Sequence, residues 1–303
     1  MMKRVDRLSR RILTTSWVTA MLVCISVAQG TEHDWLYDWP NWRGPQQNRI
    51  SAETGLVDKW NPRGGQGSNL LWKNDALAGR STPIVLGERL YTMVRHNPGK
   101  PTEGEKVVCA DVATGDILWE HRFNVYLSDV PDTRLGWSSC VADPAADRIY
   151  AQSVSGYFCC LDGESGDVVW ERSLHEEFGF LSTYGGRTNV PVVYEDTVLT
   201  SAVVIGWGDT PKWGNLAKPA HRFMAFDKAT GQLRWLDGTG ISPTDTTYST
   251  PTIQTLQHVG MDAMVFGSGD GHVWAMQPGN GKPIWKYHFS RRGVNTSPFV
   301  TPW

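Results

Sequence analysis

The sequence predicts an all-β fold, a β-propeller of four-stranded antiparallel blades. One phrase, Asp-x-x-x-Gly-x-x-x-Trp, occurs four times with one substitution in its last copy, and the copies end at Trp119, Trp170, Trp235 and Trp285. The steps between these tryptophans are 51, 65 and 50 residues. Short apolar runs flank every copy, and the chain beyond residue 30 shows no helical periodicity of useful length. Because self-similarity at about 40–50 residues is typical of propeller blades, these observations favour a repeat fold.

Each copy of the phrase predicts a β-hairpin. Its Asp caps a turn because the carboxylate accepts hydrogen bonds from backbone N–H groups two residues later. Its Gly closes the turn because glycine adopts positive φ without steric cost. The four copies occupy residues 111–119, 162–170, 227–235 and 277–285. The last copy begins with Gln277, so we expect a different cap there.

Two more strands are predicted upstream of each hairpin. The first runs lie at residues 82–85, 139–141, 190–193 and 250–253, with a fifth at 297–300. The second runs lie at residues 89–94, 148–153, 197–203 and 263–266. Most of the first runs contain proline, which has no N–H to donate, so this strand is expected at a sheet edge facing a central axis. Four strands with short turns make one blade.

These residues resemble a known family. The phrase Ala-x-Asp-x-x-Thr-Gly-x-x-x-Trp after a Ser/Thr-Pro strand is similar to the pyrroloquinoline-quinone (PQQ) repeat. Residues 38–45 and 51–55 resemble the start of many secreted bacterial PQQ-like propellers, and the likeness covers roughly residues 38–303. The resemblance implies an eight-bladed ring. It also implies one of two roles, since the family includes quinoprotein alcohol dehydrogenases and non-enzymatic propellers such as the outer-membrane-protein assembly lipoprotein of Gram-negative bacteria.

Three segments are expected along the chain. Residues 1–30 hold basic residues, an apolar run and small residues at 28–30, which predicts a cleaved signal peptide and a periplasmic or secreted protein; a membrane anchor is the alternative. Residues 31–75 include Trp72, which lies 47 residues before Trp119 and is in phase with the repeat, so a ring-closing strand is expected there. Residues 76–303 hold four complete blades and the start of a fifth, which predicts a truncated chain; a half-propeller that dimerises is the alternative.

The charge balance argues against nucleic acid and anionic membrane surfaces as partners. The chain has 29 basic and 31 acidic residues, a net charge of −2. Removal of residues 1–30 leaves 24 basic and 30 acidic residues, a net charge of −6. An acidic protein is repelled by phosphates, so neither partner is expected, and no membrane span is expected after signal cleavage.

Two adjacent cysteines pose a choice between chemistry and structure. The resemblance offers a vicinal disulfide at Cys159–Cys160, as in quinoprotein dehydrogenases. Their place in the repeat instead predicts a strand, with the two side chains on opposite faces. Four cysteines remain after residue 30 and can pair in three ways, which the sequence does not decide. The repeated Asp residues are expected to cap turns, and the repeated Trp residues to pack between blades.

A ligand-binding face is expected where two kinds of connection meet. The sequence contains no His-Glu-x-x-His, Cys-x-x-Cys or Gly-x-Ser-x-Gly motif, so no metal or catalytic residue is assigned. The connections between blades and the long connection at 206–219 share one face of a propeller, and loops on a rigid scaffold often bind ligands. The candidate ligand-binding residues on that face are Arg80, Trp137, Arg187, Trp207, Trp213, Tyr248 and Asn295.

The sequence therefore favours an exported, non-enzymatic propeller that acts as a binding or assembly scaffold. Its ligand would be a protein, a peptide or a carbohydrate, and no cofactor is expected. The alternative is a quinoprotein alcohol or sugar dehydrogenase with PQQ and calcium in the channel. A third class is an assembly factor that offers its sheet edges to partner strands by β-augmentation.

Overall fold

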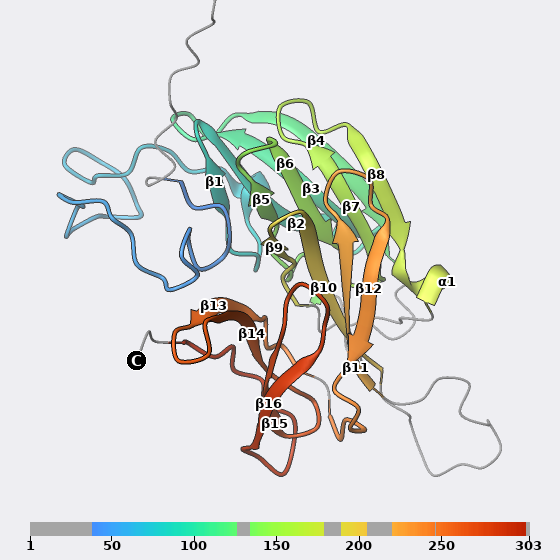
Figure 1. Cartoon of the computed structure of the whole chain (residues 1–303). Helices are drawn as coiled ribbons and strands as arrows, with labels where there is room; N and C mark the ends of the chain where they lie inside the picture. The colour runs from blue at the N-terminus through green and yellow to red at the C-terminus, as the bar shows by residue number, and fades with distance from the viewer. Residues whose placement is uncertain (1–37, 126–133, 179–188, 205–219, 246, 301–303) are drawn as a thin grey trace, which may run out of the picture. The chain divides into compact units, whose positions relative to one another are not determined.

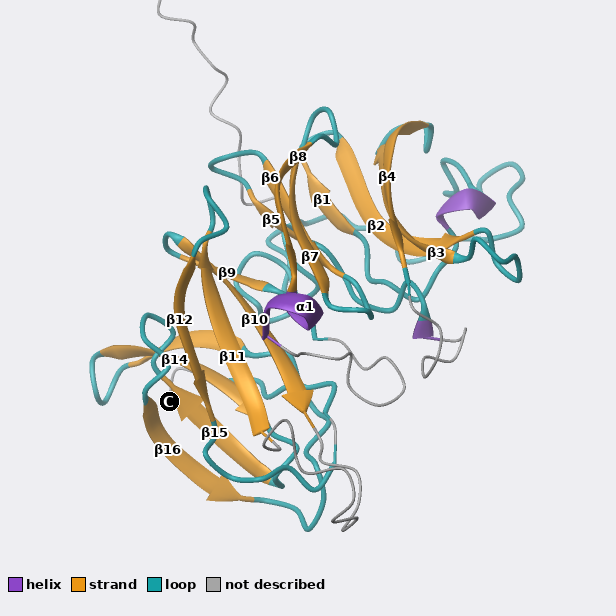
Figure 2. Ribbon diagram, turned by 90° about the vertical axis from the view of Figure 1, so that its right-hand side faces the viewer, coloured by secondary structure: helices purple, strands orange, loops and turns teal. Residues whose placement is uncertain are grey.

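The computed structural model describes residues 38–125, 134–178, 189–204, 220–245 and 247–300. The chain divides into two units, residues 1–33 and 34–303, and the described residues all belong to the second. The expected signal peptide, residues 1–30, lies outside them. Within the described ranges, strands dominate, and the helices are a 3-10 turn (Asp75–Leu77) and α1 (Leu174–Phe178), which follows β8 (Figure 2). No helix in these ranges is long and apolar enough to cross a membrane.

Four antiparallel sheets of four strands make up the described fold (Figure 1). Blade 1 contains β1 (Ile84–Leu86), β2 (Arg89–His96), β3 (Gly104–Asp111) and β4 (Ile117–Asn124). Blade 2 contains β5 (Val141–Asp143), β6 (Arg148–Gln152), β7 (Tyr157–Asp162) and β8 (Val168–Ser173). Blade 3 contains β9 (Val192–Tyr194), β10 (Thr197–Val204), β11 (Ala220–Asp227) and β12 (Leu233–Gly238). Blade 4 contains β13 (Thr252–Leu256), β14 (Met261–Gly267), β15 (His272–Met276) and β16 (Pro283–His288).

Strands follow chain order within every blade, so the first strand of each lies at a sheet edge, as predicted. The all-β class and the four propeller blades are confirmed. Two segments differ from the prediction. Residues 297–300 and the stretch around Trp72 are not strands, because no neighbouring strand among the described residues pairs with them. The ring that these segments were expected to help close stays a prediction.

The repeated tryptophans join consecutive blades through one recurring contact. Trp119, on β4 of blade 1, donates its indole N–H to the carbonyl of Gly163 in the blade 2 hairpin turn, at 3.1 Å. Its ring covers Gly166 of the same turn so closely that a Cβ atom there would lie 2.6 Å from Cδ2. Trp170 and Trp235 make the same contact with the next blade. This turn therefore requires glycine for two reasons: its φ is positive, and the indole ring leaves no room for a Cβ atom.

Trp72 makes that same contact with blade 1. Its indole N–H donates to the carbonyl of Val112 at 2.7 Å, and a Cβ atom on Gly115 would lie 2.5 Å from its ring. The phase of Trp72 in the sequence predicts this role, although its segment is not a strand. Trp72 therefore stands where a fourth-strand tryptophan of a preceding blade would stand.

The Asp residues of the phrase cap their turns, as predicted. Oδ1 of Asp111 accepts the N–H groups of Ala113 and Thr114 at 2.9 and 2.8 Å. Asp162 and Asp227 accept the equivalent pairs. The copy that begins with Gln277 uses a different cap, as expected: Nδ2 of Asn280 donates to the Gln277 side chain at 2.7 Å. The turn itself is kept, because the Gly281 N–H still bonds to the Gln277 carbonyl.

Both neighbouring cysteines are strand residues, as their place in the repeat predicts. Cys159 and Cys160 lie in β7, are fully buried and are not joined by a disulfide. Cys159 packs in the core between blades 1 and 2, whereas Cys160 packs in the core between blades 2 and 3. This placement on opposite faces follows from the alternation of side chains along a strand. Burial raises the pKa of the Cys160 thiol to about 12, so it stays protonated and unreactive at neutral pH.

An N-terminal strap, residues 38–49, crosses the first strands of three blades. Trp39 forms a β-bridge with Val85 of β1, with hydrogen bonds of 2.9 and 3.0 Å. Arg43 is 5 % exposed and donates to the carbonyl groups of Ser297 and Pro298 at 2.8 and 2.7 Å. Burial, followed by repulsion from Arg49, lowers the pKa of Arg43 to about 10. The strap thus ties the beginning of the described chain to its end.

Candidate ligand-binding site

Two aromatic side chains from different blade connections stack against each other. Trp137 lies in the connection that leads to β5, and Tyr248 lies in the connection that leads to β13. Their ring centroids are 5.9 Å apart and their planes differ by 22°. Trp137 is 38 % exposed, so part of this aromatic surface is open to a ligand. The structure therefore brings together two of the residues that the sequence singled out.

Arg134 completes this cluster, and the sequence did not single it out. Its guanidinium carbon lies 4.8 Å from the centroid of Trp137 and 5.2 Å from that of Tyr248. It also donates a hydrogen bond to the hydroxyl group of Tyr248. A guanidinium group against two aromatic faces is a favourable cation–π arrangement. The signal that could have found it is its place three residues before Trp137 in the same connection.

Asn295 holds Tyr248 from the blade 4 side. Its Oδ1 accepts the backbone N–H of Tyr248 at 3.3 Å. The neighbours Thr247 and Ser249 are fully buried, so the backbone on both sides of Tyr248 is fixed. Asn295 is itself exposed, which leaves its amide group accessible. We call Arg134, Trp137, Tyr248 and Asn295 the aromatic cluster.

A buried carboxyl group positions the connection that carries Trp137. Glu105 of β3 is fully buried and accepts the N–H of Gly136 at 2.7 Å. Its other oxygen accepts the hydroxyl group of Ser153 at 2.7 Å and the N–H of Val154 at 3.1 Å. Burial raises the pKa of this carboxyl group, and these three hydrogen bonds oppose the rise. Glu105 therefore links blade 1 to blade 2 beneath the aromatic cluster.

The remaining candidates do not join the cluster. Arg80 is exposed and makes no hydrogen bond or ion pair with the described part of the chain. Arg187, Trp207 and Trp213 lie outside the described residues, so their predicted place on this face stays a prediction.

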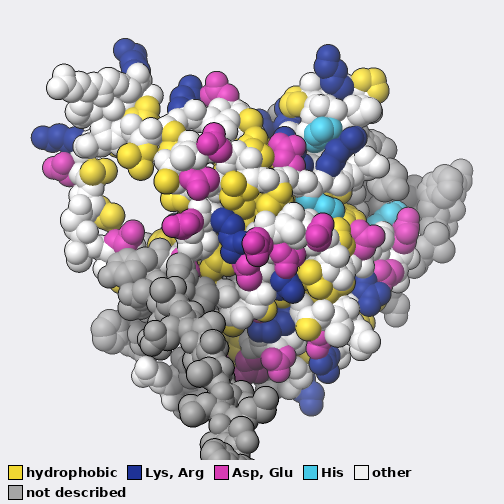
Figure 3. Space-filling model, turned by 90° about the horizontal axis from the view of Figure 1, so that it is seen from above, with side chains coloured by type: hydrophobic (Ala, Val, Ile, Leu, Met, Phe, Trp, Pro, Cys, Tyr) yellow, Lys and Arg dark blue, Asp and Glu magenta, His cyan; other side chains and the backbone are white. Residues whose placement is uncertain are grey.

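The aromatic cluster brings together side chains of different chemistry. Its four residues supply two π faces, a fixed positive charge, a phenol hydroxyl group and an amide group. Within the described ranges, no group of three His, Cys, Asp or Glu side chains could hold a metal ion. Figure 3 shows one face of the molecule, where acidic and basic side chains lie interspersed with apolar ones.

Comparisons with known proteins bear on the family of this chain. A family model described as outer membrane protein assembly factor BamB matches residues 103–301. BamB from Alteromonas naphthalenivorans is 27 % identical over 174 residues, which covers 52 % of this chain and 37 % of that protein. The chain therefore matches little more than a third of the length of this curated relative.

Two solved structures share the fold. Quinohemoprotein alcohol dehydrogenase from Comamonas testosteroni superposes with a TM-score of 0.55 at 15 % identity, over 83 % of this chain and 41 % of that one. A europium-containing methanol dehydrogenase superposes with a TM-score of 0.54 at 16 % identity, over 84 % of this chain and 49 % of that one. At such identities the likeness is one of fold. Because the family model matches well over half of the sequence, the chain belongs to the family of the outer membrane protein assembly factor BamB.

Proposed function

We propose that this protein is an exported, non-enzymatic PQQ-like propeller that acts as a binding scaffold in protein assembly. Family membership supports the assembly role, since the matching family is described by that role. The observation that carries the proposal is the aromatic cluster, a partly open π surface with a fixed cation.

A protein segment is the ligand that suits this cluster best. Tyrosine, tryptophan and arginine are enriched among the residues that dominate the binding energy of protein interfaces. Tyrosine and tryptophan present large contact areas with only two side-chain torsions. Buried neighbours fix the backbone at Tyr248, and the hydrogen bond from Gly136 to Glu105 fixes the backbone next to Trp137. Little conformational entropy is therefore lost when a ligand orders these two side chains. A carbohydrate can also stack on such rings, and it is the competing ligand class in the test below.

Export is part of the proposal. The basic residues and the apolar run within residues 1–30 support a cleaved signal peptide. N-terminal sequencing of protein recovered from the periplasm of a Gram-negative host tests it, with Thr31 as the expected first residue. Full-length chain in the membrane fraction would favour the anchor instead.

Binding to two probes tests the aromatic cluster. The probes are an unfolded outer-membrane β-barrel protein kept soluble in dilute urea, and maltoheptaose as the carbohydrate. We expect the Trp137→Ala, Tyr248→Ala double variant to bind the unfolded protein about tenfold more weakly or worse in biolayer interferometry, because aromatic truncations of this kind typically cost more than 1 kcal/mol. Trp60→Ala is the matched control, since Trp60 is 64 % exposed and lies outside the cluster. Equal affinity of the double variant and the wild type, or binding of maltoheptaose alone, would contradict the proposal.

The quinoprotein dehydrogenase is the second candidate, and the shared fold is what supports it. Two observations on the described residues weigh against it. No three His, Cys, Asp or Glu side chains of the described ranges gather as metal ligands, and the adjacent cysteines lie inside a strand. No catalytic step is derived for PQQ on this chain.

A further inference from the structure

The first strands of the four blades present equivalent backbone groups at their free edges. Val85, Ala142, Val193 and Ile253 occupy the same position, the second residue of the first strand. Each lies opposite a residue of the second strand, and hydrogen-bonded and non-hydrogen-bonded pairs alternate along such a ladder. The N–H groups of Val85, Ala142 and Ile253 bond to partners outside their sheet, so at this position the N–H points away from the second strand.

The N-terminal strap satisfies three of these four N–H groups. The Val85 N–H donates to the Trp39 carbonyl at 3.0 Å, and the Ala142 N–H donates to the Pro40 carbonyl at 2.8 Å. The Ile253 N–H donates to the side-chain carbonyl of Gln47 at 3.0 Å. In every case the acceptor is the oxygen of an uncharged amide.

The fourth N–H group, that of Val193 in β9, has no acceptor among the described residues. The hairpin that joins β9 to β10 closes at Tyr194 and Thr197, just as the β1–β2 hairpin closes at Leu86 and Arg89. Val193 therefore has the same place in its ladder as Val85, and its N–H points to the free edge. Val193 itself is only half-buried.

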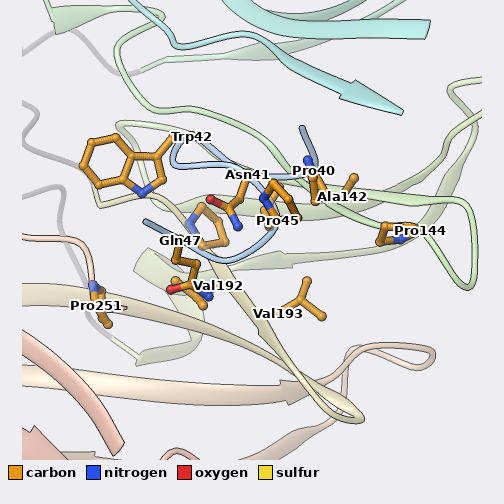
Figure 4. A pocket seen from close by; sticks show the side chains of 12 residues that line it. Pro40, Asn41, Trp42, Pro45, Gln47, Ala142, Pro144, Val192, Val193 and Pro251 are labelled. Atoms are coloured by element: carbon orange, nitrogen blue, oxygen red, sulfur yellow. The ribbon is translucent and has the colours of Figure 1, made fainter. Parts of the chain in front are cut away.

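A cavity of about 150 Å³ lies beside this edge. Val192 and Val193 of β9 line it, together with Pro40, Pro45 and Gln47 of the strap (Figure 4). All twelve lining residues are uncharged, and most are apolar. Such walls favour an apolar, uncharged segment, because burial of a charge without a partner is costly.

The strap itself does not fill this place. Between Pro40 and Gln47 its backbone turns back on itself, since the Gly44 N–H bonds to the Asn41 carbonyl and the Gln47 N–H bonds to the Gly44 carbonyl. Arg43 fixes this turn through its buried hydrogen bonds to residues 297 and 298. The strap thus passes β9 without offering it a carbonyl group, and it forms one wall of the cavity instead.

We infer that the free edge of β9 at Val193 binds an extended, uncharged peptide segment of a partner protein, whose main-chain carbonyl accepts the Val193 N–H. β-Augmentation of this kind takes its affinity from main-chain hydrogen bonds and its specificity from adjoining pockets. The strap binds the other three edges by the same kind of hydrogen bond, from a backbone N–H to an amide oxygen. The site shares no residue with the aromatic cluster, so it adds a second contact to the proposed scaffold.

A capped peptide tests this inference on the 303-residue chain. The probe is acetyl-Trp-Pro-Asn-Trp-amide, which copies residues 39–42, where the proline carbonyl accepts the Ala142 N–H. We expect saturable binding in calorimetry and slower hydrogen exchange of the Val193 amide in the complex. Acetyl-Asp-Pro-Asn-Asp-amide is the control peptide, and its charges should prevent binding.

Two substitutions separate the backbone donor from the side chain. Val193→Pro removes the N–H without loss of a native hydrogen bond, and proline is tolerated at sheet edges. We expect it to weaken probe binding about tenfold, the effect of one lost hydrogen bond. Val193→Ala keeps the N–H and should retain the slowed exchange at residue 193.

Equal binding by Val193→Pro and wild type, unchanged exchange of the Val193 amide, or no binding at all would overturn the inference. Its failure is distinct from that of the proposed function, because this experiment observes β9 whereas the other observes Trp137 and Tyr248.

Discussion

His221 is a fully buried histidine between blades 3 and 4. Its Nδ1 lies 3.1 Å from the hydroxyl group of Ser268. The centroid of its ring lies 4.8 Å from the ring centroid of Phe223 and 5.3 Å from that of Phe266. Nε2 has no hydrogen-bond partner among the described residues. Burial lowers the pKa of His221 to about 3, because a charged imidazolium would have no water around it. The ring is therefore neutral in the folded protein over the whole neutral range.

The depressed pKa makes stability depend on pH in a defined direction. Below about pH 6.5 the unfolded chain binds a proton at His221 whereas the folded chain does not, so acid favours unfolding. Stability is expected to fall as pH decreases from about 6.5 toward 3, by up to about 1.4 kcal/mol per pH unit from this group. Urea unfolding at several pH values measures the slope. His221→Gln should remove this share of the slope, and His258→Gln, at an exposed position, should not. An unchanged slope in His221→Gln would contradict this assignment.

Single residues were the hardest features to predict. The cysteines could be placed from the repeat alone, since strand alternation decides their faces. Glu105 and Arg134 could not, because one is an isolated carboxylate in a strand and the other an arginine in a loop. Their roles depend on contacts with residues 136, 153, 154 and 248, which only the folded chain brings close.

The hairpin turns couple each blade to the preceding one. Gly166 has φ +76°, and the indole ring of Trp119 lies where a side chain would begin. Glycine and tryptophan are therefore selected together, which explains why they recur at a fixed spacing in the sequence.

Gly166→Ala is expected to destabilise the protein by roughly 3 kcal/mol. Positive φ costs an alanine about 1–2 kcal/mol, and displacement of the packed indole adds a comparable amount. Gly240→Ala is the control, because Gly240 has φ +68° but nothing within 4 Å of a Cβ atom, so only the backbone cost applies. Thermal or urea unfolding of both variants measures the difference. Equal destabilisation would show that the indole contact does not constrain this turn.

Strands and turns were predictable because each carries a local signal. Alternating apolar residues, the Asp-x-x-x-Gly turn and edge prolines can each be recognised within a window of about ten residues. The strap was missed for the opposite reason. It has no periodicity, and its hydrogen bonds go to strands about 45, 100 and 210 residues away in the sequence.

The whole chain combines the family of an assembly factor with the fold of quinoprotein dehydrogenases. Fold alone does not decide between them, since a scaffold can carry unrelated sites. The proposed scaffold role rests instead on particular residues: the aromatic cluster, and the buried cysteines with strongly raised pKa values.

Titration with PQQ and calcium chloride checks this choice. We expect no saturable, calcium-dependent change in quinone absorbance and no dye-linked oxidation of ethanol or glucose above the buffer blank, because no three His, Cys, Asp or Glu side chains of the described ranges gather as metal ligands. A known quinoprotein dehydrogenase, reconstituted in parallel, is the control for cofactor quality. Stoichiometric PQQ binding with turnover would establish the dehydrogenase instead.

The anchoring of Arg43 has a consequence for the order of folding. Its partners at residues 297 and 298 are separated from it by 254 and 255 positions in the sequence. A growing chain emerges from its N-terminus, so the strap exists long before the carbonyl groups that hold it. Contacts of such high sequence separation form slowly, because the loop must close before they are made. Until then the turn that presents Gln47 lacks its anchor, and the edge of β13 remains open to other chains.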